Sequence, residues 1–353
     1  MTGMVTLAQV AQAAGVSPST VSYVLSGNRA ISTPTRTRVE ATIARLGYHP
    51  NAGARALAGR RSHILALVVP LRTDIYVPVM MEIAIAVTTA ARGFGYDVLL
   101  LTSDEGSAGV RRVAGSGLAD GVILMDVQLD DPRIAVLRET GAPAALIGLP
   151  GDPSGLACAD HDFAYAGVLC AEHLADLGHR DVAFIGYSPA VYQRHSGYAE
   201  RTLGGFQAAA DRLGLRALHR PCEGTFESVA GVVTRILADR PDTTGFVVQN
   251  EGAIQPLLSL LRASGRVVPE DVSVLALCPE ALAEQCSPRL TAVTGPAKEL
   301  GALAVELIAD RLAGRPTEEV TLLGPVLTRR ESTGPAPRRQ PTPGLAPTRK
   351  SAR

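Results

Sequence analysis

Residues 5–26 constrain the fold more than any other stretch, because they have the pattern of two short helices joined by a tight turn. Thr6 and Gln9 have the spacing of a capping box, which begins the first helix. Its apolar face repeats at intervals of three and four residues and consists of Leu7, Val10, Ala11 and Ala14. Gly15 ends this helix, because glycine readily adopts the left-handed backbone of a helix C-cap.

The second helix begins at Ser17, which caps it, and Pro18, whose missing N–H costs nothing at the first helical position. Its predicted buried stripe consists of Val21, Val24 and Leu25. The opposite face carries uncharged hydrogen-bonding groups, namely Ser19, Ser22 and Tyr23. Such a face suits the major groove of DNA, where the first residues of a recognition helix reach base edges. The alternative is a helical hairpin that only packs on its neighbour.

A third helix is expected after residue 31. Ser32 or Thr33 caps it, and its inward face consists of Val39, Ile43 and Leu46. Pro34 begins it and Gly47 ends it. Together the three helices predict a small all-α headpiece.

Residues 48–61 form a candidate linker. Asn51 can cap one or two helical turns and Gly59 can close them, but Gly53 lies in the middle. A helix this short is marginal by itself, since helix nucleation is costly. We therefore expect a linker that becomes helical only when a partner holds it.

Charge is divided unevenly along the chain, although the formal net charge is +0 at pH 7. Residues 1–62 hold seven arginines and one acidic residue, Glu40, which gives +6. The remaining 291 residues carry 27 basic and 33 acidic groups, which gives −6. A basic head on an acidic body is typical of a nucleic-acid-binding module.

From residue 62 onward, short apolar runs alternate with helical patterns. The predicted strands are 64–69, 97–101, 121–124, 144–147, 181–185, 245–248 and 272–277. The predicted helices include 77–92, 166–177, 203–213, 229–239 and 254–264. This alternation indicates parallel sheets in an α/β fold. About 270 residues of such a pattern exceed one comfortable core, so we expect two lobes.

Cysteine usage and hydropathy indicate the compartment. The five cysteines have no tight spacing, which argues against a disulfide framework. No signal-peptide pattern precedes the first helix, and no apolar run approaches the roughly 18 residues of a membrane span. We therefore expect a cytoplasmic protein without a membrane partner.

Patterns that would carry catalysis or hold a metal are weak. Cys170 and His173 are spaced as two metal ligands, but no second pair is obvious, so a buried thiol and a helix-end histidine are the simpler interpretation. Asp160 and Asp162 form either an acid pair or the polar edge of a cleft. The sequence therefore predicts no catalytic residue, no metal and no cofactor. An α/β enzyme or a solute-binding domain is the alternative to a DNA-binding regulator.

Over residues 4 to about 333 the order of parts resembles the lactose-repressor (LacI/GalR) family of bacterial transcription regulators. The headpiece carries Thr6-Leu7, Val10-Ala11, Ala14-Gly15-Val16-Ser17 and Thr20-Val21-Ser22, and the hinge carries Leu46-Gly47-Tyr48, Pro50-Asn51-Ala52, Ala54-Arg55 and Leu57. Further matching motifs lie at 172–180, 268–274 and 330–333.

The resemblance implies a repressor-type transcriptional regulator. It implies a homodimer that binds a palindromic DNA operator, and a two-lobed domain, similar to periplasmic sugar-binding proteins, that holds a small-molecule effector. A carbohydrate is the best single candidate for that effector. In the family, effector binding shifts the lobes, and the hinge helices then make or break their contacts with DNA.

The resemblance also implies DNA-contacting residues. Ser19 and Tyr23 are expected to read bases, whereas short polar side chains such as Ser17 hold phosphates. Leu57 matches a leucine that wedges between base pairs at the operator centre, and the alternative is an ordinary packing leucine. The full predicted set is Thr6, Leu7, Ser17, Pro18, Ser19, Thr20, Ser22, Tyr23, Ser26, Asn51, Ala54, Arg55 and Leu57.

The effector site departs from the family pattern. Cys278 stands where the family has an effector-binding aspartate, and Arg201 lies one place off the register of the family's arginine. A pocket different from the usual sugar pocket is therefore expected. The predicted effector contacts are Asp74, Tyr76, Asp162, Phe163, Tyr187, Arg201, Asn250, Glu251 and Cys278.

Four segments follow from these patterns. They are a helix-turn-helix headpiece (1–49), a hinge (50–61), a two-lobed α/β effector-binding and dimerisation domain of the periplasmic-binding-protein type (62–333), and a disordered tail (334–353). Tetrameric relatives carry a leucine-heptad helix at the C-terminus, whereas five prolines interrupt this tail. We therefore expect a dimer.

Overall fold

The computed structural model describes residues 5–26, 29–48 and 61–337. The chain divides into two compact units, one made chiefly of residues 1–62 and the other of residues 63–115 and 120–353. We call the first the headpiece and the second the body.

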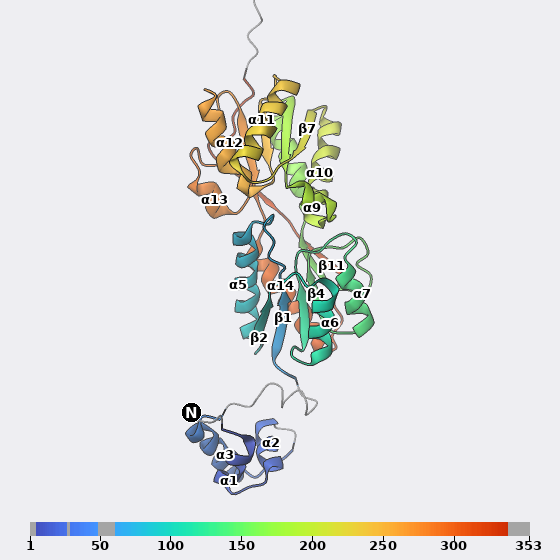
Figure 1. Ribbon diagram of the computed structural model, residues 1–353, viewed down its shortest axis with the longest axis vertical. Coiled ribbons are helices and arrows are strands. Elements are labelled where there is room, and N and C mark those ends of the chain that lie inside the picture. Colours follow the sequence, from blue (N-terminus) through green and yellow to red (C-terminus); the bar gives the residue numbers. More distant parts are fainter. Residues whose placement is uncertain (1–4, 27–28, 49–60, 338–353) are drawn as a thin grey trace, which may run out of the picture. The chain divides into compact units, whose positions relative to one another are not determined.

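The headpiece is a three-helix unit (Figure 1). Its helices are α1 (Leu7–Ala14), α2 (Pro18–Ser26) and α3 (Thr33–Leu46). The capping box is confirmed, because Gln9 N donates to Thr6 Oγ1 at 3.3 Å and Thr6 N donates to Gln9 Oε1 at 2.8 Å. Gly15 takes the left-handed conformation, with φ 65°, and closes α1 as predicted.

The headpiece core is built mainly of small apolar side chains, with one tyrosine. Its buried members are Val10, Ala11, Ala14, Val21, Val24, Val39 and Tyr48. The prediction that Leu25 belongs to this core is wrong, because Leu25 is 38% exposed. It lies beside the stripe formed by Val21 and Val24, where a core of three short helices does not cover it.

The body contains two six-stranded sheets, each in its own lobe, with helices on both sides (Figure 1). The first sheet has the order β11-β5-β4-β3-β1-β2 and is parallel throughout. Its strands are β1 (Ile64–Val68), β2 (Asp97–Leu101), β3 (Gly121–Leu124), β4 (Ala144–Ile147), β5 (Cys158–His161) and β11 (Val320–Leu323). The helices of this N-terminal lobe are α5 (Val77–Gly93), α6 (Gly106–Ser116), α7 (Pro132–Thr140) and α14 (Ala297–Leu312).

The C-terminal lobe repeats this architecture with the order β12-β10-β9-β8-β6-β7, in which only β12 is antiparallel among the described strands. Its strands are β6 (Asp181–Gly186), β7 (Arg216–Pro221), β8 (Gly245–Val248), β9 (Ser273–Leu277), β10 (Thr291–Thr294) and β12 (Val326–Thr328). Its helices are α8 (Phe163–Asp176), α9 (Pro189–Gln193), α10 (Gly197–Leu213), α11 (Phe226–Asp239), α12 (Glu251–Ala263) and α13 (Glu280–Gln285).

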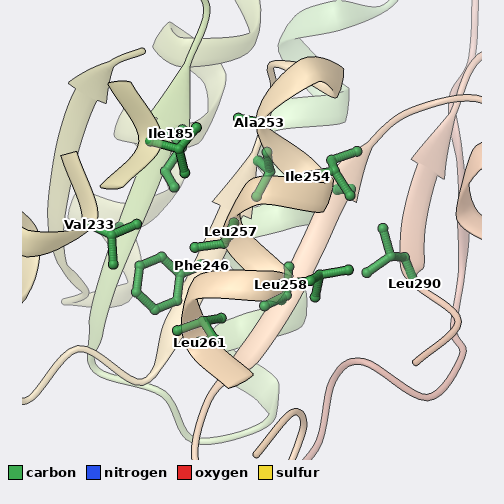
Figure 2. Packing of buried hydrophobic residues seen from close by; sticks show 14 of the residues in the cluster. Ile185, Val233, Phe246, Ala253, Ile254, Leu257, Leu258, Leu261 and Leu290 are labelled. Carbon is green, nitrogen blue, oxygen red and sulfur yellow. The ribbon is translucent and has the colours of Figure 1, made fainter. Parts of the chain in front are cut away.

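Both faces of the C-terminal sheet are buried, as expected for parallel strands between helices. Ala183 and Ile185 of β6 face the core under α11 and α12, while Val182 and Phe184 face the core under α8 and α10. Figure 2 shows the first of these cores, in which α12 contributes Ala253, Ile254, Leu257, Leu258 and Leu261.

Helices α8 and α10 approach each other closely because glycines lie at their contact. A Cβ atom on Gly167 would lie 2.1 Å from the carbonyl oxygen of Thr202, and one on Gly205 would lie 2.0 Å from that of Ala164. Neither position therefore tolerates a side chain without a shift of backbone. This packing holds the start of α10 next to the place where the chain passes between the lobes.

The histidines of the 172–180 motif have structural roles. His179 is fully buried and contacts Thr244 Oγ1 at 2.8 Å, Ser273 Oγ at 3.0 Å and the carbonyl oxygen of Gly334 at 3.2 Å. His173 Nε2 lies 2.9 Å from Thr333 Oγ1. These bonds fasten residues 333–334 near the N-terminal ends of β6, β8 and β9, so the prediction that the tail is disordered from residue 334 is wrong for residues 334–337. Residues 338–353 of that predicted tail lie outside the described residues. Burial lowers the pKa of both histidines.

Candidate functional site

The exposed face of α2 begins at its N-terminal end. Ser17 Oγ accepts from Thr20 N at 3.2 Å and lies 2.9 Å from Thr20 Oγ1, so it caps the helix as predicted. Ser17, Pro18 and Ser19 are exposed, whereas Thr20, Ser22 and Tyr23 are half-buried. The first turn holds no acidic residue. The partial positive charge of the helix N-terminus therefore faces solvent without a neutralising carboxylate on that turn.

Tyr23 lies next to a guanidinium that the sequence alone did not single out. The Arg29 guanidinium carbon is 5.6 Å from the centre of the Tyr23 ring, within the range of a cation–π contact. Arg29 thus adds positive charge beside the predicted base-reading residue.

The remaining predicted DNA contacts divide into two groups. Thr6 is exposed and Leu7 half-buried at the start of α1, and Ser26 is the last residue of α2. The hinge residues Asn51, Ala54, Arg55 and Leu57 lie outside the described residues. The assignments of both groups remain predictions.

A cavity of about 370 Å³ lies in the body where the two lobes meet. Each sheet has a topological switch point, at β1/β3 in one lobe and β6/β8 in the other, because the chain crosses from one edge of the sheet to the other there. Ligands of open α/β sheets bind outside the carboxyl ends of the strands at such points. Asp126 follows β3 and Glu251 follows β8, and both lie on the cavity wall.

Segments that pass between the lobes complete the wall. His161 and Phe163 come from the β5–α8 crossing, and residues 294–297 come from the β10–α14 crossing. Gly295 is required there, since a Cβ atom would lie 2.7 Å from the His161 ring. Three neighbouring aromatic rings lie on one side of the cavity. The ring centres of Phe163 and Tyr198 are 6.0 Å apart, and those of Tyr187 and Tyr198 are 5.3 Å apart.

Two buried carboxyl groups on the wall have pKa values near neutral pH. Burial raises the pKa of Asp160 and of Glu251 to about 7 each. Tyr187 Oη donates to Glu251 Oε2 at 3.0 Å. Burial, followed by the charge of Glu251, raises the pKa of Cys278 to about 12, so this thiol is neutral and a weaker hydrogen-bonding group than a carboxylate.

Five of the nine predicted effector contacts lie on this wall, namely Tyr76, Phe163, Tyr187, Glu251 and Cys278. The other four are not among the wall residues, and each is bound inside the protein. Asp162 caps α8 by accepting from Tyr165 N at 2.9 Å, and Asn250 caps α12 by accepting from Gly252 N at 3.0 Å. Arg201 donates to the carbonyl oxygen of Leu149 at 2.6 Å.

Asp74, the fourth of these residues, forms an ion pair between the lobes. Arg194 Nη1 lies 2.5 Å from Asp74 Oδ2, and both side chains are at most one-fifth exposed. The pair therefore joins the β1–α5 loop of the N-terminal lobe to the end of α9 in the C-terminal lobe.

Sequence reasoning missed several polar wall residues, among them Asp126, His161 and Gln249. Asp160, for which an acid pair or a cleft edge was expected, and Tyr198, in the stretch 187–198 expected near the cleft, both lie on the wall. Asp126 comes two residues after a strand whose bounds were predicted correctly. The rule that places ligands at the carboxyl ends of strands would have selected it. The position of Gln249 depends on contacts between distant segments, such as the hydrogen bond from Tyr192 Oη to Gln249 Oε1 at 3.0 Å.

Within the described part of the chain, no three histidine, cysteine, aspartate or glutamate residues gather as a metal site. All five cysteines are buried and free. In the same residues, no helix combines the length and apolar character that a bilayer span requires.

Comparison with known proteins decides the family. Residues 6–51 match the bacterial regulatory proteins of the lacI family, and residues 171–333 match the periplasmic binding protein-like domain. The chain is 33% identical over 328 residues to the HTH-type transcriptional regulator CelR of Thermobifida fusca, covering 90% of this chain and 95% of that protein. The chain belongs to the LacI family. This LacI-family protein is also 26% identical over 310 residues to catabolite control protein A of Priestia megaterium, covering 86% of this chain and 91% of that protein.

Solved structures agree with the family. The transcriptional regulator CelR–cellobiose complex matches this LacI-family chain with a TM-score of 0.66 and 30% identity, covering 93% of this chain and 99% of that one. A lac repressor bound to ONPG in the repressed state matches with a TM-score of 0.79 and 26% identity, covering 94% and 100%. The protein is thus a transcriptional regulator with a DNA-binding headpiece and a two-lobed α/β body.

Proposed function

We propose that this LacI-family protein is a cytoplasmic repressor without catalytic activity, which binds a palindromic operator as a homodimer and responds to a carbohydrate effector. The observation that carries the DNA-binding part is the outer face of α2, on which Ser19 is exposed and Tyr23 lies beside Arg29. Ser19 and Tyr23 read base edges, and Ser17, Thr20, Ser22 and Thr6 hold phosphates.

The carbohydrate fits the cavity in size and chemistry. A volume of about 370 Å³ lies within the range of pockets for small ligands. Aromatic rings such as Phe163 and Tyr198 offer flat apolar surface to the C–H faces of a sugar ring. Carboxyl groups such as Glu251 exchange hydrogen bonds with its hydroxyls. The solved CelR–cellobiose complex supports a sugar in a structurally similar protein.

Exposed apolar residues of the N-terminal lobe support self-association. Leu99 and Leu100 on the edge strand β2 are 38% and 41% exposed, and Ile85 on α5 is 62% exposed. An edge strand has a neighbouring strand on one side only, and exposed leucines on such a strand favour contact with a second chain. A solved lac repressor of the same fold is a dimer bound to operator.

Selection of bound sequences from a random DNA library by the full-length protein tests the proposal. We expect a palindromic site that is enriched over random DNA and whose occupancy changes when a disaccharide such as cellobiose is added. Enrichment of no sequence would overturn operator recognition. Enrichment without a response to any sugar would overturn the carbohydrate effector alone.

A further inference from the structure

The ionisable residues on the cavity wall are mostly acidic. Among its described residues six are acidic, namely Glu82, Asp126, Asp160, Glu251, Glu280 and Glu299, and one is basic, Lys298. His161 adds no positive charge near neutral pH, because burial lowers its pKa to about 4. A cleft whose charges have one sign attracts or repels ligands according to their charge.

Asp126 is the most specific element of this wall. Its side chain is 2% exposed, and Oδ2 accepts from Arg72 Nη1 in an ion pair. Its second oxygen, Oδ1, is buried and has no hydrogen-bond partner within the described part of the chain. A buried carboxylate oxygen without a donor is costly, and a ligand hydroxyl is the donor that would satisfy it.

The protein holds Asp126 in place at the expense of backbone strain. Its φ of 53° lies in the left-handed region that residues other than glycine seldom adopt. Arg133, which is 4% exposed, donates from Nη2 to the carbonyl oxygen of Asp126 at 2.7 Å and pairs with Asp131 at 2.6 Å. Strain that the surrounding structure maintains is typical of ligand sites.

The positive charge that balances Asp126 lies behind the wall. Arg72 is not among the wall residues, and its Nε lies 2.8 Å from Asp104 Oδ2, so two carboxylates share this guanidinium. An anionic ligand would therefore meet the Asp126 carboxylate, and the carboxyls of Glu251 and Asp160 that are partly protonated near pH 7, without a guanidinium on the wall to receive it. A neutral polyol would instead donate its hydroxyls to the same groups.

We propose that the cavity selects its effector by charge, and that it takes a neutral polyhydroxylated ligand and rejects phosphorylated sugars, with Asp126 as the anchoring carboxylate. This inference rests on the proposed carbohydrate effector and states which class of sugar it is. Like charges brought together without water repel strongly, so we expect phosphorylation to weaken binding by about 100-fold or more.

Calorimetric titration of the full-length protein with matched probes tests the proposal. The probes are cellobiose, maltose and lactose, each compared with its 6-phosphate. We expect at least one neutral sugar to bind and its phosphate to bind about 100-fold more weakly or not at all. In Asp126→Asn we expect the neutral sugar to bind about tenfold more weakly. The ratio between the affinity for the neutral sugar and the affinity for its 6-phosphate should also become smaller.

Asp126→Asn keeps the backbone, because asparagine accepts the left-handed conformation at least as well as aspartate. Its thermal unfolding is measured alongside, and Glu251→Gln serves as a second variant expected to narrow the same preference. Asp104→Asn is the matched control, since Asp104 binds the same Arg72 but is half-exposed and not on the wall. This control is expected to leave the affinities of both probes unchanged.

The outcomes separate the two proposals. Tighter binding of a 6-phosphate than of its parent sugar would overturn charge selection and leave a carbohydrate effector in place. An unchanged preference in a folded Asp126→Asn would overturn the role of Asp126. Binding of none of the six probes would overturn the carbohydrate effector and the charge selection together.

Discussion

The headpiece and the cavity present their polar groups in opposite ways. On α2 the predicted DNA contacts are uncharged side chains that are exposed, such as Ser19, or half-buried, such as Tyr23, over a core built mainly of small apolar residues. In the cavity the polar groups are buried carboxyls, with Asp160 4% and Glu251 8% exposed. A surface contact can be removed with little effect on folding, whereas a buried carboxyl is coupled to the stability of its lobe. Recognition and stability should therefore separate in the headpiece and remain linked in the cavity.

Destroying the headpiece core gives the largest expected effect. Val21 is fully buried, and Val21→Asp places an unpaired charge in a core of seven buried residues. We expect operator affinity to fall by more than about 100-fold, because several kcal/mol exceed what a small unit can lose. Sugar affinity should not change. Gel-shift and calorimetric titrations of one preparation measure both, and a parallel loss of sugar binding would show that the units do not fold independently.

Removal of a base-reading side chain gives the next largest effect. Tyr23→Ala should cost about 1–3 kcal/mol of operator affinity and relax the preference at one base position. Ser17→Ala is the comparison, because loss of a phosphate contact should weaken binding to all sequences alike. Ser17 also caps α2, so this variant should lose about 1 kcal/mol of headpiece stability. Selection from a random library with each variant measures the preference. If the site preferred by Tyr23→Ala is the parental one, Tyr23 does not read bases.

In the cavity, one lost hydrogen bond should change binding and stability together. Tyr187→Phe removes the donor to Glu251 and leaves a buried carboxyl without that bond. We expect about 1–2 kcal/mol of destabilisation together with weaker sugar binding. Tyr165→Phe, at an aromatic residue that is 47% exposed and absent from the wall, is the control. Weaker sugar binding with an unchanged melting temperature would break the proposed link.

The last expected effect is a change in the pH dependence of stability. Burial raises the pKa of Glu251 to about 7, above the value of about 4.3 in an unfolded chain. The folded state therefore holds a proton that the unfolded state releases. The stability that this group contributes is complete below about pH 4.3 and is lost as the pH rises through about 7.

Glu251→Gln removes that dependence. The melting temperature of the variant minus that of the parent should increase as the pH rises from 5 to 8, because only the parent loses this contribution to stability. Burial lowers the pKa of His161 and His173 to about 4, so their contribution to stability is lost as the pH falls from about 6.5 toward 4. Both proteins contain these histidines, so their effect cancels in the comparison. A constant difference in melting temperature across this range would contradict the shifted pKa of Glu251.

Local patterns in the sequence predicted the elements that fold by local rules. The capping box of Thr6 and Gln9, the glycine at 15 and the strand bounds 97–101, 121–124, 144–147 and 245–248 are confirmed. The strands β5, β7, β10, β11 and β12 were missed. In β5 and β7 the local signal is weak, because Cys158–His161 and Arg216–Pro221 mix charged with apolar residues. Their pairing with β4 and β6 overrides this weak local preference. The first six residues of α10 were missed as well, and the tight contact with α8 accounts for them.

The cavity was harder to predict, because its wall joins residues far apart in the chain. Asp162 and Asn250 are polar and follow strands, but the side chain of each accepts a hydrogen bond from the first turn of the next helix and caps it. Asp126 has the same type of position but is free at one oxygen among the described residues. A polar residue after a strand can cap the next helix or face a ligand, and only the three-dimensional contacts distinguish the two.

The central claim is that a sugar in the cavity controls the affinity of the headpiece for DNA. The direct measurement is the operator dissociation constant of the full-length protein without a sugar and with a saturating neutral disaccharide that binds the cavity. We expect a change of roughly 5- to 150-fold, and the operator should change the sugar's affinity by the same factor. An operator affinity that stays the same while the cavity is saturated would contradict the account.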